Sequence, residues 1–234
     1  MSVKSWTRHK FVLPTAVLCG LFIVNINLFC ASLNEKQIEA WLNNETEDLP
    51  YTPINEGELK FLTTPPQKKV HHHHNTLIVY KASMQDGWIK LQQCHEHLDT
   101  INNAQVVYKK GKIKNLKIIS KQNIEKAWIE NFSVQLRNIK KGARICIEAD
   151  SRALKKNDDG TFTLSNGPFM RRFLDGYFPM RVSMDLRLPS DLKFISILPK
   201  QQKGFRVNHT KKGVHFDAWF EGKLYTKINL LKNK

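Results

Sequence analysis

The sequence lacks every short motif that would name a reaction. It contains no nucleophile elbow, phosphate-binding loop, dinucleotide-binding fingerprint or helical zinc-protease motif. Each of these motifs holds reactive groups at a fixed spacing on a defined turn or helix, so their absence removes the enzyme classes built on them. An enzyme whose site residues converge only in the fold stays open. No cofactor is expected.

Acidic residues are scarce. The chain has 21 Asp and Glu against 37 Lys and Arg, which gives a formal net charge of +16. A surplus of this size creates a positive field that attracts polyanions or anionic lipid head groups. A general lysine bias is the alternative explanation. Several of the acids crowd the stretch between Glu35 and Glu58, so the positive charge belongs mainly to the C-terminal part.

Charge is absent altogether from residues 11–31, which are mostly apolar. Three basic residues precede this run, and Glu35 and Glu39 follow it, which predicts a cytoplasmic N-terminus and a remainder outside the cytoplasm. At about 1.5 Å per residue, a helix over this run spans a hydrocarbon core of roughly 30 Å. We therefore predict that residues 1–31 form a membrane anchor.

A cleaved signal segment is the alternative to an anchor. Asn25 and Asn27 interrupt the apolar run, and the small residues at positions 30–32 are a tolerable cleavage site. The protein would then be secreted or periplasmic. A lipid-modified Cys30 is a weaker alternative, because bulky Phe29 stands before it.

Three further segments follow the apolar run. Residues 32–42 begin with Ser and carry apolar side chains at partly helical spacing, which predicts a short amphipathic helix or an extension of the membrane helix. Residues 43–74 are polar and contain four prolines, so we predict a linker that includes a tract of four histidines. Residues 75–234 are the predicted folded domain, which is basic and rich in β-strands.

Alternation of apolar and polar residues indicates the fold class of this domain. Residues 180–188 and 214–220 alternate cleanly, and turn-forming residues separate short β-rich runs elsewhere. This pattern predicts a mostly β protein with an antiparallel β-sandwich or barrel-like domain. One short helix is expected within residues 166–179, where Pro168 suits a first helical position and Gly176 suits the position after the last turn.

Only two of the four cysteines lie in the predicted domain, Cys94 and Cys146. A domain outside the cytoplasm meets an oxidising compartment, so two lone cysteines on strand-like runs predict a disulfide. Two independent buried thiols are the alternative.

Imidazole groups suggest a possible metal site. His71, His72, His73 and His74 are consecutive, and Cys94, His95 and His97 are possible additional ligands. Their spacing matches neither a zinc finger nor a helical metalloprotease. A solvated linker is the other interpretation of the tract.

A mixture of aromatic rings and guanidinium groups marks a possible ligand-binding surface. These residues are Phe169, Arg171, Arg172, Phe173 and Tyr177. Such a mixture could bind an anionic amphiphile or lie at a membrane interface. The alternative is a helix that closes one end of the sheet. A run of lysines over residues 109–117 is interpreted first as a solvated face.

These features favour a non-enzymatic, membrane-tethered accessory protein outside the cytoplasm that binds a partner protein or an anionic ligand such as lipid or polysaccharide. A metal-handling protein that uses the histidine tract is the alternative, and an enzyme with a hidden site is the third hypothesis. Nucleic acid is not an expected partner, because no basic-aromatic recognition motif is present.

Overall fold

The computed structural model describes residues 55–233. The predicted segments at 1–31 and 32–42 lie outside this range. Within it, the prediction of a mostly β protein is confirmed: fifteen strands and one short helix, α2 (Ser83–Asp86), make up its regular structure. No helix among the described residues is long and apolar enough to cross a membrane.

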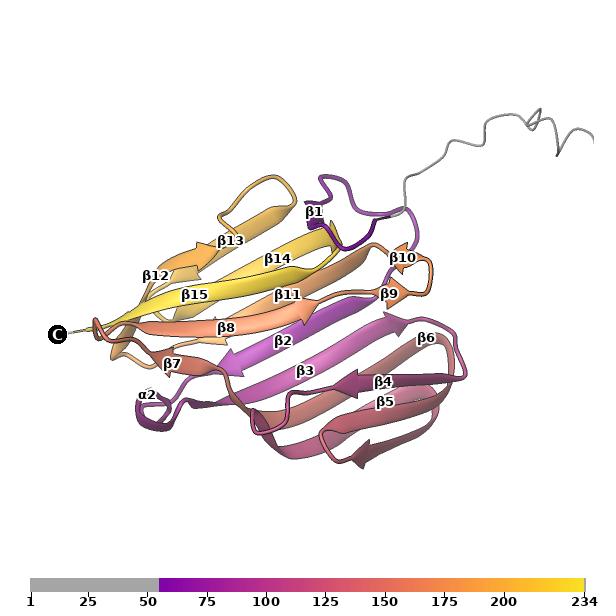
Figure 1. Ribbon diagram of the computed structural model, residues 1–234, viewed down its shortest axis with the longest axis horizontal. Coiled ribbons are helices and arrows are strands. Elements are labelled where there is room, and N and C mark those ends of the chain that lie inside the picture. Colours follow the sequence, from indigo (N-terminus) through magenta and orange to yellow (C-terminus); the bar gives the residue numbers. More distant parts are fainter. Residues whose placement is uncertain (1–54, 234) are drawn as a thin grey trace, which may run out of the picture. The chain divides into compact units, whose positions relative to one another are not determined.

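The strands form two main sheets and a small hairpin (Figure 1). The larger sheet follows the order β1 (Lys60–Phe61), β14 (Gly213–Glu221), β11 (Met180–Arg187), β2 (His72–Ile78), β3 (Trp88–Leu98), β6 (Ser133–Arg152) and β4 (Asn103–Val107), with β13 (Phe205–Thr210) paired to β14 and β5 (Ile113–Glu130) paired to β6. The smaller sheet follows the order β12 (Leu192–Leu198), β15 (Leu224–Lys232), β8 (Phe162–Phe169) and β7 (Leu154–Lys156). The hairpin consists of β9 (Arg172–Phe173) and β10 (Gly176–Tyr177).

One strand pair departs from the expected antiparallel arrangement. β2 and β11 run parallel at the centre of the larger sheet, and the other main-sheet pairs are antiparallel. The two strands are about a hundred residues apart in sequence, so no tight turn constrains their direction.

A single core lies between the two sheets. The alternation predicted for residues 180–188 and 214–220 is confirmed, because Val182, Met184, Phe216 and their neighbours of the same phase are buried. They pack in one cluster with residues of the smaller sheet such as Ile228. The intervening residues of β11 and β14 are mostly polar and face away from this core.

The long β5–β6 hairpin bends and builds a second core. The first part of β6 pairs with β4 and its last part pairs with β3, while β5 follows β6 along both parts. Between the two parts Asn138 and Gly142 have positive φ angles of 52° and 74°. Such angles interrupt the regular strand and suit Asn and Gly. The second core contains Val134, Leu136 and Ile145.

Two expectations about local structure are wrong. The histidine tract does not lie in a linker: His72, His73 and His74 are the first residues of the central strand β2, where ladder pairing on both sides orders them. The helix expected within residues 166–179 is absent. β8 continues through this segment to Phe169, which pairs with Leu224, and the chain then forms the β9–β10 hairpin.

The predicted disulfide is confirmed. Cys94 on β3 and Cys146 on β6 are direct cross-strand partners, and their Cα atoms are 4.1 Å apart. The bond therefore fastens the β5–β6 hairpin to the rest of the larger sheet.

Replacing both cysteines by Ala should lower the free energy of unfolding by roughly 2–4 kcal/mol, because the bond closes a long loop of the unfolded chain. The sequence separation of the two residues is 52. Urea denaturation followed by circular dichroism measures the change. Reduction of the unaltered protein by dithiothreitol should give the same midpoint as the double variant, and equal midpoints for oxidised protein and double variant would contradict the prediction.

Candidate ligand-binding groove

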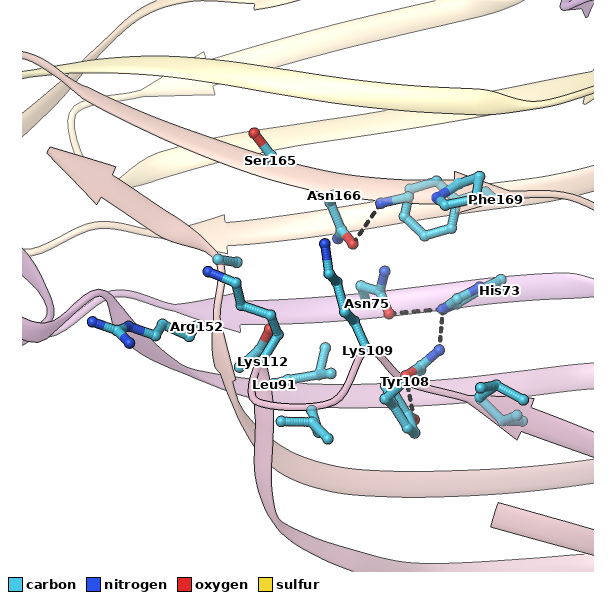
Figure 2. A pocket seen from close by; sticks show the side chains of 18 of the residues that line it. His73, Asn75, Leu91, Tyr108, Lys109, Lys112, Arg152, Ser165, Asn166 and Phe169 are labelled. Carbon is cyan, nitrogen blue, oxygen red and sulfur yellow. Dashed lines mark hydrogen bonds between the residues drawn. The ribbon is translucent and has the colours of Figure 1, made fainter. Parts of the chain in front are cut away.

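A cavity of about 1100 Å³ lies beside the part of the larger sheet that the smaller sheet does not cover. Its floor is formed by β2 and β3 and includes His73, Asn75 and Gln93 (Figure 2). One wall is residues 104–109, from β4 and the turn after it, and the other is residues 165–170, from β8 and the residue that follows. We call this cavity the groove.

A continuous hydrogen-bond network occupies the floor. The Tyr108 hydroxyl donates to Gln93 Oε1 over 2.7 Å. The Gln93 amide nitrogen lies 2.6 Å from His73 Nε2 and 3.0 Å from His95 Nε2. His95 Nδ1 lies 2.9 Å from His71 Nε2. An amide nitrogen is a donor, so His95 Nε2 accepts from Gln93 and His95 Nδ1 donates onward to His71. His73 Nε2 lies between the Gln93 amide nitrogen and Asn75 Oδ1, which is 2.9 Å away.

Burial keeps these imidazoles neutral. It lowers the pKa of His73 to about 3 and that of His71 to about 4, and it places the pKa of His95 well below the usual value. The positively charged form of each ring would lose its hydration in this environment. Burial also raises the pKa of Tyr108, so its hydroxyl stays protonated. The floor therefore offers polar but uncharged groups.

The charged residues that line the groove are almost all basic. Asp86 is the one acid among them, and its carboxylate accepts a hydrogen bond from the backbone N–H of Trp88. Figure 2 shows Lys109 and Lys112 reaching into the groove from the turn between β4 and β5. The basic lining residues are Lys109, Lys112, Arg152, Lys155 and Lys156. A concave site lined by charges of one sign concentrates the opposite charge, so the groove favours anions.

Apolar side chains supply the remaining lining. Leu91 belongs to the floor, Val106 to the β4 wall and Phe169 to the β8 wall. The Phe169 ring also packs edge-on against His73, with ring centroids 5.0 Å apart. A ligand that fits this lining carries negative charge and some apolar surface.

The histidine tract divides between the two faces of the larger sheet. His73 points to the groove, whereas His72 and His74 bond Ser183 and Asp185 on the opposite face, at 2.7 and 2.9 Å. Successive strand residues point to opposite faces, so the tract cannot converge on one ion. Residues 55–233 contain no group of three or more His, Cys, Asp or Glu side chains arranged to hold a metal.

The face opposite the groove carries a second polar arrangement. His72 lies between Ser183 Oγ, at 2.7 Å from its Nε2, and Glu96, at 3.7 Å from its Nδ1. Ser183 is only 6% exposed, and none of the three residues lines the groove. A nucleophile must reach its substrate and a carboxylate must hydrogen-bond the histidine it orients. We therefore assign no reaction to this arrangement.

The five residues predicted to bind a ligand do not lie together in one site. Phe169 lines the groove. Arg171 is held away by two hydrogen bonds to Asp99, of 2.9 and 2.6 Å. The other three, Arg172, Phe173 and Tyr177, line a separate hollow of about 320 Å³ beside the β9–β10 hairpin.

Most residues of the groove's floor were not predicted from the sequence. Asn75, Gln93 and Tyr108 were not singled out, and Lys109 and Lys112 were interpreted as part of a solvated face. A signal was present: Asn75 has the same strand phase as buried Leu77, and Gln93 the same phase as buried Leu91. Polar residues in an apolar phase mark a buried polar network.

Known proteins add no assignment to this geometry. No protein-family model matches the chain, and no curated protein shows significant similarity to it.

The neutral floor predicts that stability falls with falling pH. The pKa values of His73 and His95 lie below their unfolded values, so the unfolded chain takes up protons below about pH 6.5 while the folded chain does not. Stability should be complete above that pH and should decline by about 1 kcal/mol per buried histidine by pH 5.5.

Urea denaturation at a series of pH values measures this decline. His95→Gln should have a smaller loss between pH 7 and pH 5.5 than the unaltered protein, whereas His209→Gln, at an exposed position of β13, should keep the full loss. Identical pH profiles for all three proteins would refute the assignment of neutral buried rings.

Proposed function

We propose that the protein is a non-enzymatic, membrane-tethered binding module whose groove takes an anionic ligand with some apolar surface. The observation that carries the proposal is the charge of the lining: five basic residues and one acid surround a floor of neutral polar groups. The long-range attraction comes from the cations, and the neutral floor adds no charge that would oppose it.

The state of the floor favours binding over catalysis. A general base needs a pKa near the working pH, and the burial of His71 and His73 moves their pKa values far below it. The ring nitrogens of His73 and His95 are also engaged with Gln93. A rigid, mutually bonded set of groups suits recognition, because it holds the floor of the groove in one shape before a ligand binds.

The size of the groove favours an extended ligand. Pockets for small molecules usually enclose about 300–1,000 Å³, and this groove reaches about 1100 Å³. Its basic residues come from the turn after β4, the end of β6 and β7, so they belong to separate segments of the lining.

The tether is a prediction from residues 11–31 and their flanks. The full chain should fractionate with membranes, and a reporter fused to its C-terminus should be active outside the cytoplasm. A mature N-terminus near Leu33 would show a cleaved signal instead. Activity of the reporter in the cytoplasm would contradict the proposed location.

Reversing two charges at the groove should weaken anion binding. We expect Lys109→Glu combined with Lys112→Glu to weaken binding at least tenfold, because two attractions become repulsions. Two probes measure it on the full chain in neutral lipid nanodiscs: a fluorescein-labelled octapeptide that alternates Glu and Val, and a heparin-derived hexasaccharide. At least one probe should bind the unaltered protein, as measured by fluorescence anisotropy or by competition.

A matched control is available at the turn between β13 and β14. Lys211→Glu combined with Lys212→Glu changes the net charge equally, and both residues are exposed and lie outside the groove. Binding should survive this change. Equal weakening by both pairs would assign binding to the overall charge, and no binding of either probe would reject the proposed function.

A further inference from the structure

Among residues 55–233, no strand pairs with the outer edge of β4, which forms one wall of the groove. β4 is the last strand in the order of the larger sheet, and it pairs with β6 along one side. The Tyr108 N–H donates to the Phe132 carbonyl, and the Asn138 N–H donates to the Asn102 carbonyl. Antiparallel residues alternate in hydrogen bonding, so the even-numbered residues of β4 bond to β6. Asn103, Gln105 and Val107 direct their backbone N–H and C=O groups to the other side.

This free edge faces the groove. Six consecutive residues, 104–109, line the cavity. A strand that turned one face to a cavity would contribute only every second residue, because successive side chains point to opposite faces. Consecutive lining residues therefore indicate an edge-on strand, and Val107, with 64% of its surface exposed, lies within this stretch.

The opposite wall does not offer an equivalent edge. β7 pairs with the first part of β8, through residues 162–164. Beyond it, the Gly167 N–H donates to the Asn166 side chain, and Pro168 has no N–H to offer. β7 is also an edge strand whose residues line the groove, but it has only three residues, and the Leu154 N–H already donates to the Gly87 carbonyl. Of the strand edges that border the groove, β4 therefore offers the longest free stretch to another strand.

We propose that the groove binds an extended acidic peptide segment of a partner protein, which adds to the free edge of β4 as a new strand. This inference rests on the proposed function and names its ligand. Strand addition uses main-chain hydrogen bonds for affinity and adjacent pockets for alternate side chains. A five-residue strand spans roughly 17 Å at about 3.4 Å per residue, and the groove runs along β4 from Ala104 to its last residue, Val107.

The lining selects acidic character and favours a peptide over other polyanions. Lys109 and Lys112 follow the free edge directly, so carboxylates on the added strand meet them as the strand passes the end of β4. Side chains on the strand's other phase meet Val106 and Phe169. An acidic oligosaccharide can pair with the charges of the lysines. It has no repeating N–H and C=O groups, however, that could hydrogen-bond the backbone of Asn103, Gln105 and Val107.

Backbone methylation of the Glu-Val octapeptide tests the pairing directly. One peptide carries N-methyl groups on its Glu residues and a second carries them on its Val residues. Only one set of N–H groups faces β4, so one peptide should lose at least tenfold in affinity and the other should bind nearly as well as the parent. The charge and side chains stay the same in all three. Unchanged affinity for both methylated peptides would overturn strand addition.

A substitution on the protein side removes one edge donor. Gln105→Pro deletes an N–H that β6 does not use, and proline is tolerated on edge strands at such positions. We expect at least a tenfold loss of peptide binding, whereas Gln105→Thr, which keeps the N–H, should bind normally. If the Pro variant does not fold, as shown by circular dichroism, the methylated peptides still decide the question.

The hexasaccharide separates failure of this inference from failure of the proposed function. Hexasaccharide binding that depends on Lys109 and Lys112, with no binding of the parent peptide, would overturn the peptide and leave an anion-binding groove. Peptide binding that Gln105→Pro leaves unchanged in a folded variant would also overturn it. Loss of peptide binding in Gln105→Pro, with hexasaccharide binding or native circular dichroism retained, would support it.

Discussion

The bend in the β5–β6 hairpin is the constraint on which the groove depends. A straight β6 would carry β3 and β4 end to end along one flat edge, because they pair with different residues of it. Because Asn138 and Gly142 interrupt the strand, its two parts serve different neighbours. β4 is thereby set apart from β3, and the inner face of β2 and β3 stays open beside β8. The Cys94–Cys146 bond fixes the β3 side of this arrangement.

An open sheet face requires a particular kind of floor. Asn75, Gln93 and His95 are buried in that floor, each 5% exposed or less. Polar residues there must satisfy one another, because a buried polar group without a partner costs about 1–3 kcal/mol. The chain from Tyr108 through Gln93 to the imidazoles meets this demand without any charge. The network makes the stability of the fold sensitive to acid, because a proton on any of the rings breaks the pattern of donors and acceptors.

The fold class was predicted from the sequence more accurately than the site, because strand alternation is a local pattern and the pairing of distant strands is not. Alternation in β11 and β14 reports burial against a layer, so those strands and the mostly β class could be found from local pattern. The disulfide was predicted from the expected oxidising compartment and from the presence of only two cysteines in the predicted domain. The bend at Asn138 and Gly142 depends on which strands flank β6, and pairing between distant segments leaves no local periodicity. The interpretation of the histidine tract as a linker was wrong for the same reason. Its polar composition is typical of a linker, but pairing with β3 and β11 on either side makes it a strand.

A free strand edge beside exposed Val107 is a hazard in any β protein, because it can pair with a second copy of the same chain. Lysines placed near an edge are a common defence, since two copies then bring like charges together. Lys109, Lys110 and Lys112 stand directly after β4 in this chain. In the proposed complex the same charges attract a strand of opposite sign, so one local feature opposes self-pairing and favours the acidic peptide that we propose.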